Sequence, residues 1–327
     1  MALDDATTAL LGQLAESGLE PLHEMTPVEA RGLGGMLGAM YGPGPEMARV
    51  EEVAIPTPDG PLPGRVLVPA GTPRGVIIYY HGGGWVIGAL DEFDTLGRNL
   101  AERSSCTVVL VDYRLAPEAR YPAASDDAFA ALTWVDDNLA SLAAPGAPVV
   151  VMGDSAGGHL ATVVARQARD AGGPAVAMQV LVYPVTDCDL ETPSYLDPAN
   201  QLLLSRDGMV WFWDHYVPDA ARRTEPDASP LRTPDLSGLP PAVVLLAEHD
   251  VLHDEGKAYA QRLRDAGVPV QERVFEGQMH GFFTLINVLP ASMTAIEHVA
   301  QAVDAHLSGA AALPGQRKQA DDTVASA

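Results

Sequence analysis

The sequence is poor in cysteine and in long apolar runs. Of its 327 residues only Cys106 and Cys188 are cysteines, too few for a disulfide framework, and we expect two reduced thiols. No segment reaches the roughly 18 uninterrupted apolar residues that a membrane-spanning helix needs. The first residues also lack a basic stretch followed by an apolar core, so we expect no secretory signal, no membrane span and a cytoplasmic location.

Positive charge is scarce as well. The chain has 43 acidic against 20 basic residues, a formal net charge of −23 with histidine neutral, and only Lys257 and Lys318 are lysines. Because this field repels phosphate backbones and anionic lipid surfaces, we expect no nucleic-acid partner. A bias in base composition and a salt-adapted surface would each produce the same balance, and the sequence leaves that choice open.

The apolar residues that are present follow an α/β pattern. Short continuous apolar runs, typical of strands buried on both faces of a parallel sheet, alternate with helical patterns, which predicts repeated β-α-β units. The predicted strands are 76–80, 108–111, 149–151, 180–182, 243–246 and 270–275. The predicted helices among and after them are 122–139, 157–171, 254–266 and 290–307.

Other segments lie outside this rhythm. Residues 3–17 and 27–40 predict two amphipathic helices, either an accessory arm or a lid, and Thr26 is the predicted N-cap of the second. Residues 49–68 predict an antiparallel hairpin. Residues 187–240 are rich in proline and acids and look like an insertion.

These patterns predict three regions. Residues 1–48 form an N-terminal helical region, and residues 49–308 form one α/β domain that contains the insertion at about 187–240. The small, polar tail at 309–327 is expected to be disordered.

The strongest functional signal lies between Val149 and Leu160. An apolar strand leads into the Gly-x-Ser-x-Gly turn of residues 153–157 and then into apolar residues at helical spacing, so Ser155 lies between strand and helix. Such a turn needs small residues around the serine and exposes its hydroxyl at the carboxyl edge of the sheet. We therefore predict that Ser155 is a nucleophile.

A serine nucleophile needs a base within hydrogen-bond reach. Among nine histidines, His280 follows the last predicted strand in a loop of small residues, where it can project over the sheet edge. His159 lies in the first turn after Ser155 and is expected to point along its helix instead. We predict His280 as the base.

The base in turn needs a carboxylate that orients it. The strand whose apolar run is 243–246 continues to about residue 249, and Asp250 lies at its carboxyl end. Asp250 is the predicted acid. Its rivals are Glu248, which is still within the strand, and Asp254, which falls at the start of the next helix and can stabilise that helix end.

Negative charge on an ester carbonyl oxygen requires hydrogen-bond donors. The glycine run after the strand at 76–80 lets backbone amides approach a ligand closely, so Gly82 and Gly83, with the amide of Ala156, are the predicted oxyanion hole. Aromatic residues gather in a predicted helix at 207–216. The residues that we assign to the wall of a substrate pocket are Trp85, Tyr183, Trp211 and Phe212.

Taken together, these motifs closely resemble those of the hormone-sensitive-lipase-like carboxylesterases of the α/β-hydrolase superfamily. The likeness spans about residues 50–307, and the order of serine, acid and histidine along the chain is that of α/β-hydrolases. The runs that carry it are His81 to Trp85, Asp112 to Glu118, Gly153 to Gly158, Tyr183-Pro184, Asp250 and His280 to Phe282.

The resemblance implies an α/β fold with a mostly parallel eight-stranded sheet, flanking helices and a helical cap. The cap would consist of the N-terminal helices of residues 1–48 and the insertion at about 187–240, on a catalytic domain at 49–308. The resemblance also implies hydrolysis of short-chain acyl esters without a cofactor, a small-molecule ester as partner, and pairing as a homodimer. The chain departs from the family's usual residues at Val251, His253 and His159, which affects the loop geometry and not the three predicted catalytic residues.

The residues disfavour two other functions on the same fold. A silent ligand receptor would lose the catalytic histidine, but His280 is present, and a lyase is usually recognised by an altered glycine loop, but Gly82 to Gly84 are intact. The sequence holds no His-Glu-x-x-His and no clustered Cys/His spacing, so we expect no metal.

Overall fold

The computed structural model describes residues 2–18, 20–38 and 40–309 of the chain. Within them, eight strands form one sheet in the order β1-β2-β4-β3-β5-β6-β7-β8. The strands are β1 (Arg49–Ile55), β2 (Leu62–Val68), β3 (Val76–Tyr80), β4 (Thr107–Val111), β5 (Val149–Asp154), β6 (Met178–Val182), β7 (Ala242–His249) and β8 (Val270–Met279).

Helices separate and cover these strands. The α-helices are α1 (Asp5–Glu16), α2 (Pro27–Gly38), α3 (Leu90–Ser104), α4 (Ala123–Asp137), α5 (Leu139–Leu142), α6 (Ala156–Ala171), α7 (Pro193–Leu196), α8 (Arg206–Tyr216), α9 (His253–Asp265) and α10 (Pro290–Leu307). The short 3-10 helices are η1 (Leu22–Glu24), η2 (Pro198–Asn200), η3 (Ala220–Thr224) and η4 (Pro230–Arg232).

The sheet is parallel except at one edge. β1 pairs with β2 and β2 with β4 in antiparallel fashion, and all other neighbours are parallel. β3 lies between β4 and β5, with Ile78 opposite Val109 on one side and Val151 on the other. The mostly parallel eight-stranded α/β-hydrolase sheet implied by the resemblance is therefore confirmed.

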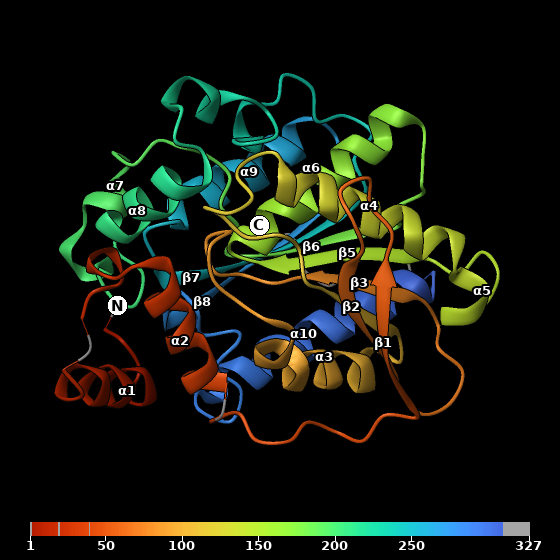
Figure 1. Cartoon of the computed structure of the whole chain (residues 1–327), viewed down its shortest axis with the longest axis horizontal. Helices are drawn as coiled ribbons and strands as arrows, with labels where there is room; N and C mark the ends of the chain where they lie inside the picture. The colour runs from red at the N-terminus through yellow and green to blue at the C-terminus, as the bar shows by residue number, and fades with distance from the viewer. Residues whose placement is uncertain (1, 19, 39, 310–327) are drawn as a thin grey trace, which may run out of the picture.

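Each central strand contributes side chains to two hydrophobic cores, because successive side chains point to opposite faces of the sheet. In β3, Ile78 and Tyr80 belong to one hydrophobic cluster, and Ile77 and Tyr79 belong to the other. Helices α4, α6 and α9 cover one face of the sheet, and α3 and α10 cover the other (Figure 1). The continuous apolar runs in the sequence follow from this burial on both faces.

The N-terminal helices and the segment 187–240 lie beyond the sheet. In Figure 1, α2 and α8 lie on the same side of the molecule, near the ends of β7 and β8. The predicted cap of α2 is present: the Thr26 backbone N–H donates to the Glu29 carboxylate at 2.8 Å, and the Glu29 N–H donates to Thr26 Oγ1 at 3.3 Å.

The structure differs slightly from the sequence prediction at the start of α8. Helix α8 begins at Arg206, one residue before the predicted start, because Ser205 is its N-cap and accepts a hydrogen bond from the Gly208 N–H at 3.1 Å. The predicted disordered tail at 309–327 lies, except for Gly309, outside the described residues. In the part of the chain that the structure describes, no helix is both long and apolar enough to cross a membrane.

Candidate active site

Ser155 lies in the turn between β5 and α6. Its backbone has φ 54° and ψ −118°, a conformation that L-residues rarely adopt and that here turns the chain sharply from strand to helix. The Ser155 N–H donates to the Val182 carbonyl of β6 at 2.9 Å, which fixes the turn. The side chain is only 6% exposed and lies at the carboxyl end of the central strands.

Small residues make room for this turn. A Cβ at Gly153 would overlap the backbone carbonyl of Gly157, and a Cβ at Gly157 would overlap the carbonyl oxygen of Tyr80. Glycine at these two positions therefore lets α6 approach β3 and β5 more closely than a residue with a side chain would allow.

This close approach predicts a loss of stability in Gly157→Ala. Because the added methyl group would meet strand backbone that cannot rotate away, the free energy of unfolding should fall by about 1–3 kcal/mol. Urea unfolding measures it, with Gly12→Ala in α1 as the control, since open space surrounds Gly12. Equal unfolding midpoints for Gly157→Ala and the wild type would show that the turn at Ser155 is not tightly packed.

The structure brings together the three side chains that the sequence singles out. His280 Nε2 lies 2.9 Å from Ser155 Oγ, and His280 Nδ1 lies 2.7 Å from Asp250 Oδ2. Asp250 is 1% exposed, and its other oxygen accepts the Leu252 N–H at 2.9 Å. Because an ionised carboxylate only accepts, Nδ1 carries the imidazole proton and Nε2 accepts from the serine hydroxyl.

The rival residues are engaged elsewhere. Glu248 accepts the Gly277 N–H at 2.7 Å, and Asp254 accepts the Ser194 N–H at 2.8 Å. His159 accepts from Trp85 Nε1 at 3.1 Å and lies 3.0 Å from a backbone carbonyl. Burial lowers the pKa of His159 to about 3, so this ring is a neutral packing residue, as its position on the helix suggested.

One predicted oxyanion donor is wrong. The Gly82 N–H already donates to Asp154 Oδ1 at 2.9 Å, and the Tyr79 hydroxyl donates to the same oxygen at 2.6 Å. Burial raises the pKa of Asp154 to about 6, although both hydrogen bonds act in the opposite direction. Among the described residues, no acceptor is bonded to the N–H of Gly83 or Gly84. The sequence could not show that the Asp154 side chain turns back onto the glycine loop.

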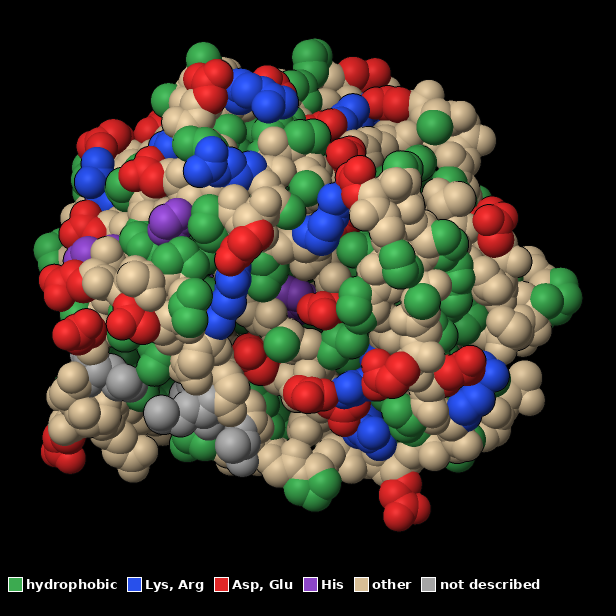
Figure 2. Space-filling model, in the orientation of Figure 1, with side chains coloured by type: hydrophobic (Ala, Val, Ile, Leu, Met, Phe, Trp, Pro, Cys, Tyr) green, Lys and Arg blue, Asp and Glu red, His purple; other side chains and the backbone are tan. Residues whose placement is uncertain are grey.

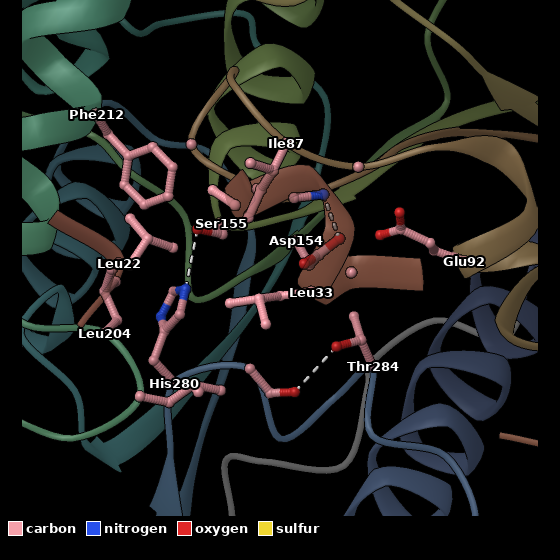
Figure 3. A pocket seen from close by; sticks show the side chains of 18 of the residues that line it. Leu22, Leu33, Ile87, Glu92, Asp154, Ser155, Leu204, Phe212, His280 and Thr284 are labelled. Carbon is pink, nitrogen blue, oxygen red and sulfur yellow. Dashed lines mark hydrogen bonds between the residues drawn. The ribbon is translucent and has the colours of Figure 1, made fainter. Parts of the chain in front are cut away.

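A cavity of about 210 Å³ opens beside Ser155 and His280 (Figure 3). Helix α2, the glycine loop, α3, the segment 201–212 and the turn after β8 all contribute to its wall. The lining side chains besides Ser155 and His280 include Leu22, Leu33, Tyr41, Ile87, Glu92, Phe93, Asp154, Leu203, Leu204, Met209, Phe212 and Thr284.

Of the four residues that we assigned to the pocket wall, only Phe212 lines this cavity. Trp85 is fully buried and stacks on Tyr216, with ring centroids 4.2 Å apart. Trp211 donates to a backbone carbonyl of the N-terminal segment at 3.2 Å. Tyr183 is buried against the His280 ring, with centroids 4.5 Å apart. These three assignments are corrected: the three rings lie outside the lining of the cavity.

The chain matches known proteins along most of its length. A family described as having an alpha/beta hydrolase fold matches residues 77–284. A carboxylesterase of Mycobacterium tuberculosis is 45% identical over 223 residues, which is 67% of this chain and 70% of that protein. An ethyl acetate hydrolase of Pseudomonas putida is 36% identical over 321 residues, 94% of this chain and all of that protein.

A solved structure agrees over a similar span. The hyperthermophilic esterase of the archaeon Pyrobaculum calidifontis superposes with a TM-score of 0.86 at 37% identity, covering 95% of this chain and all of that one. This chain belongs to the hormone-sensitive-lipase-like carboxylesterases of the α/β-hydrolase superfamily.

Sequence reasoning missed much of the cavity wall of this carboxylesterase. Leu22, Leu33 and Tyr41 come from the N-terminal segment, and Glu92 comes from the first turn of α3. Their positions depend on how α2 packs against α3, which no local pattern encodes. The amphipathic N-terminal helices were the only available signal. In the described residues no group of three or more histidine, cysteine or acidic side chains is arranged to hold a metal ion.

Proposed function

We propose that Ser155 is the nucleophile, His280 the general base and Asp250 the residue that orients the base in ester hydrolysis by this carboxylesterase. The hydrogen-bonded chain from Asp250 through His280 to Ser155, which ends at the cavity, carries this proposal. A serine hydroxyl is a weak nucleophile at neutral pH, and the adjacent acceptor Nε2 can take its proton as the oxygen attacks.

The reaction follows from these positions. The Ser155 oxygen attacks the ester carbonyl carbon while His280 Nε2 takes the hydroxyl proton, and the same proton then passes to the departing alcohol. This leaves an acyl-enzyme and neutral His280. A water molecule next gives a proton to Nε2 as it attacks the acyl carbon, and Ser155 recovers its proton when the acid leaves.

The negative charge that develops on the carbonyl oxygen needs donors. We propose that the N–H groups of Gly83, Gly84 and Ala156 provide them. Ala156 begins α6, whose N-terminal amides point toward the serine, and Gly83 and Gly84 line the cavity. The hydrogen bond from the Gly82 N–H to Asp154 then has a positioning role, because it fixes the glycine loop, Gly82 to Gly84, beside the turn at Ser155.

We further propose that residues 1–48 and the insertion at about 187–240 form a cap on the catalytic domain at 49–308. Arg31 of α2 supports this division. Its guanidinium donates to the carbonyls of Val86 and Ala116, each at 2.9 Å, and to the Glu118 carboxylate. These bonds hold α2 against the loops below it. The cytoplasmic location, the possible homodimer and the lack of a nucleic-acid partner remain predictions.

The size of the cavity favours short acyl chains. Its volume of about 210 Å³ is below the roughly 300–1,000 Å³ of pockets for drug-sized ligands. In a series of p-nitrophenyl esters from acetate to palmitate, kcat/KM should peak at or below about six carbons and fall steeply for longer chains, because additional methylene groups find no room. A maximum on long chains, or no hydrolysis of any ester in the series by folded protein, would contradict the proposal.

A further inference from the structure

The wall of the cavity differs in polarity between the two sides of Ser155. In Figure 3, Phe212, Leu22 and Leu204 lie on one side of Ser155, and Glu92 lies on the other. An ester with its carbonyl carbon at Ser155 therefore directs one of its halves toward apolar side chains. Its other half extends toward a carboxyl group. A pocket made only for neutral aliphatic esters gains nothing from that carboxyl group, because burying a charge without a partner is costly.

Glu92 is held against bare helix backbone. It lies in the first turn of α3, and its side chain crosses to α2, where a Cβ at Gly34 would come within 2.7 Å of its Cδ. Glycine at position 34 therefore leaves space for the carboxylate. Within the described ranges, no side chain or backbone N–H is hydrogen-bonded to its oxygens, and burial is the main influence on it. The carboxylate faces the cavity with its hydrogen-bonding capacity unused.

The charged groups around Glu92 offer it no compensation. Burial, with the nearby negative charges of Asp112 and Asp91, raises the pKa of Glu92 to about 7. The guanidinium of Arg65 is already shared among other carboxylates. Its partners are Glu52 at 2.6 Å, Asp91 at 2.8 Å and Asp94 at 3.0 Å. A cation brought by the substrate would meet a carboxylate that has no hydrogen-bond or ion-pair partner in the part of the chain that the structure describes.

We propose that Glu92 determines substrate specificity by favouring esters that carry a positive charge on the half that extends to its side of Ser155. The inference rests on the proposed ester hydrolysis at Ser155 and names a substrate class for it. An alkylammonium group placed there offsets the cost of the buried carboxylate, whereas a neutral group of the same shape leaves that cost in place.

Two pairs of esters of equal shape test this. Butyrylcholine and 3,3-dimethylbutyl butyrate differ by one nitrogen in the alcohol half. The phenyl esters of trimethylammonioacetic acid and 3,3-dimethylbutanoic acid differ in the same way in the acyl half. For each pair the ratio of kcat/KM, charged over neutral, is measured at about pH 8.5, where a carboxyl group with the raised pKa is ionised. Comparing ratios between variants cancels the intrinsic reactivity of each ester.

Glu92→Gln should lower the ratio about tenfold for at least one pair, the size expected from one partly screened charge pair. The pair that responds identifies the half that faces Glu92. Glu92→Asp keeps the charge and should retain most of the ratio. Asp91→Asn is the matched control, because it removes the same charge one residue away from a side chain that is 88% exposed; its ratio should change less than about twofold.

The control matters because acidic side chains are spread over the surface (Figure 2), and a general attraction for cations would affect all variants equally. A second readout needs only p-nitrophenyl acetate: choline should inhibit its hydrolysis better than 3,3-dimethylbutan-1-ol, and Glu92→Gln should remove that difference. Ratios unchanged by Glu92→Gln, or lowered equally by Asp91→Asn, would overturn the inference. If the wild type hydrolysed p-nitrophenyl acetate but neither charged ester, the inference would fail alone; if it hydrolysed neither these esters nor p-nitrophenyl acetate, the proposed function itself would fail.

Discussion

Ser155→Ala is expected to lower kcat for p-nitrophenyl butyrate by roughly 10⁶-fold, to the background rate of the assay. In the proposed reaction the hydroxyl forms the acyl bond, and the structure positions it 2.9 Å from His280 Nε2, the proposed acceptor of its proton. Alanine removes the hydroxyl and leaves the strained turn and its backbone hydrogen bond to β6 in place. The measurement is steady-state hydrolysis with a matched circular-dichroism spectrum.

Ser237→Ala provides the control for this result, because Ser237 is an exposed serine outside the cavity. Its kcat should equal that of the wild type. A folded Ser155→Ala protein that still hydrolyses the ester at a rate near that of the wild type would show that another nucleophile acts.

Asp250→Asn is expected to lower kcat by about 10⁴-fold, as loss of the orienting carboxylate does in serine proteases. The asparagine amide can still accept the Leu252 N–H, which Asp250 accepts at 2.9 Å. Its NH₂ group then faces His280 Nδ1, and this nitrogen must accept instead of donating. The imidazole proton moves to Nε2, which can no longer take a proton from Ser155. Stopped assays at high enzyme concentration measure the residual rate.

Asp254→Asn is the matched control, because Asp254 was the rival acid and accepts the Ser194 N–H at 2.8 Å. Its kcat should change by less than about tenfold, since asparagine can still accept the Ser194 N–H and this hydrogen bond does not involve Ser155, His280 or Asp250. A larger loss in Asp254→Asn than in Asp250→Asn would reverse the assignment of the acid.

The sequence predicted the sheet and the positions of the three polar residues for a simple reason. Parallel strands that are buried on both faces appear in the sequence as continuous apolar runs, and their carboxyl ends meet at one edge of the sheet. Ser155 and Asp250 each follow such a run, and His280 follows the edge strand β8, which runs parallel to β7. Their convergence at one edge of the sheet therefore follows from topology.

The contacts that involve side chains turning back could not be predicted in this way. Asp154 directly precedes Ser155, yet its carboxylate accepts a hydrogen bond from the N–H of Gly82, 72 residues earlier in the chain. Glu92 lies in the first turn of α3, where negative charge is favourable, and no sequence pattern marks it as a cavity residue. Only the packing of α2 against α3, with glycine at position 34, shows that its carboxylate reaches the cavity.

Covalent labelling tests the central claim, that Ser155 attacks the substrate, most directly. Diethyl p-nitrophenyl phosphate should inactivate the wild type by transferring one diethylphosphoryl group, and peptide mass spectrometry should find it on Ser155 in proportion to the activity lost. His280→Ala, which lacks the base next to Ser155 Oγ, should be labelled far more slowly. Complete inactivation with the adduct on a different residue, or with Ser155 unmodified, would contradict the assignment.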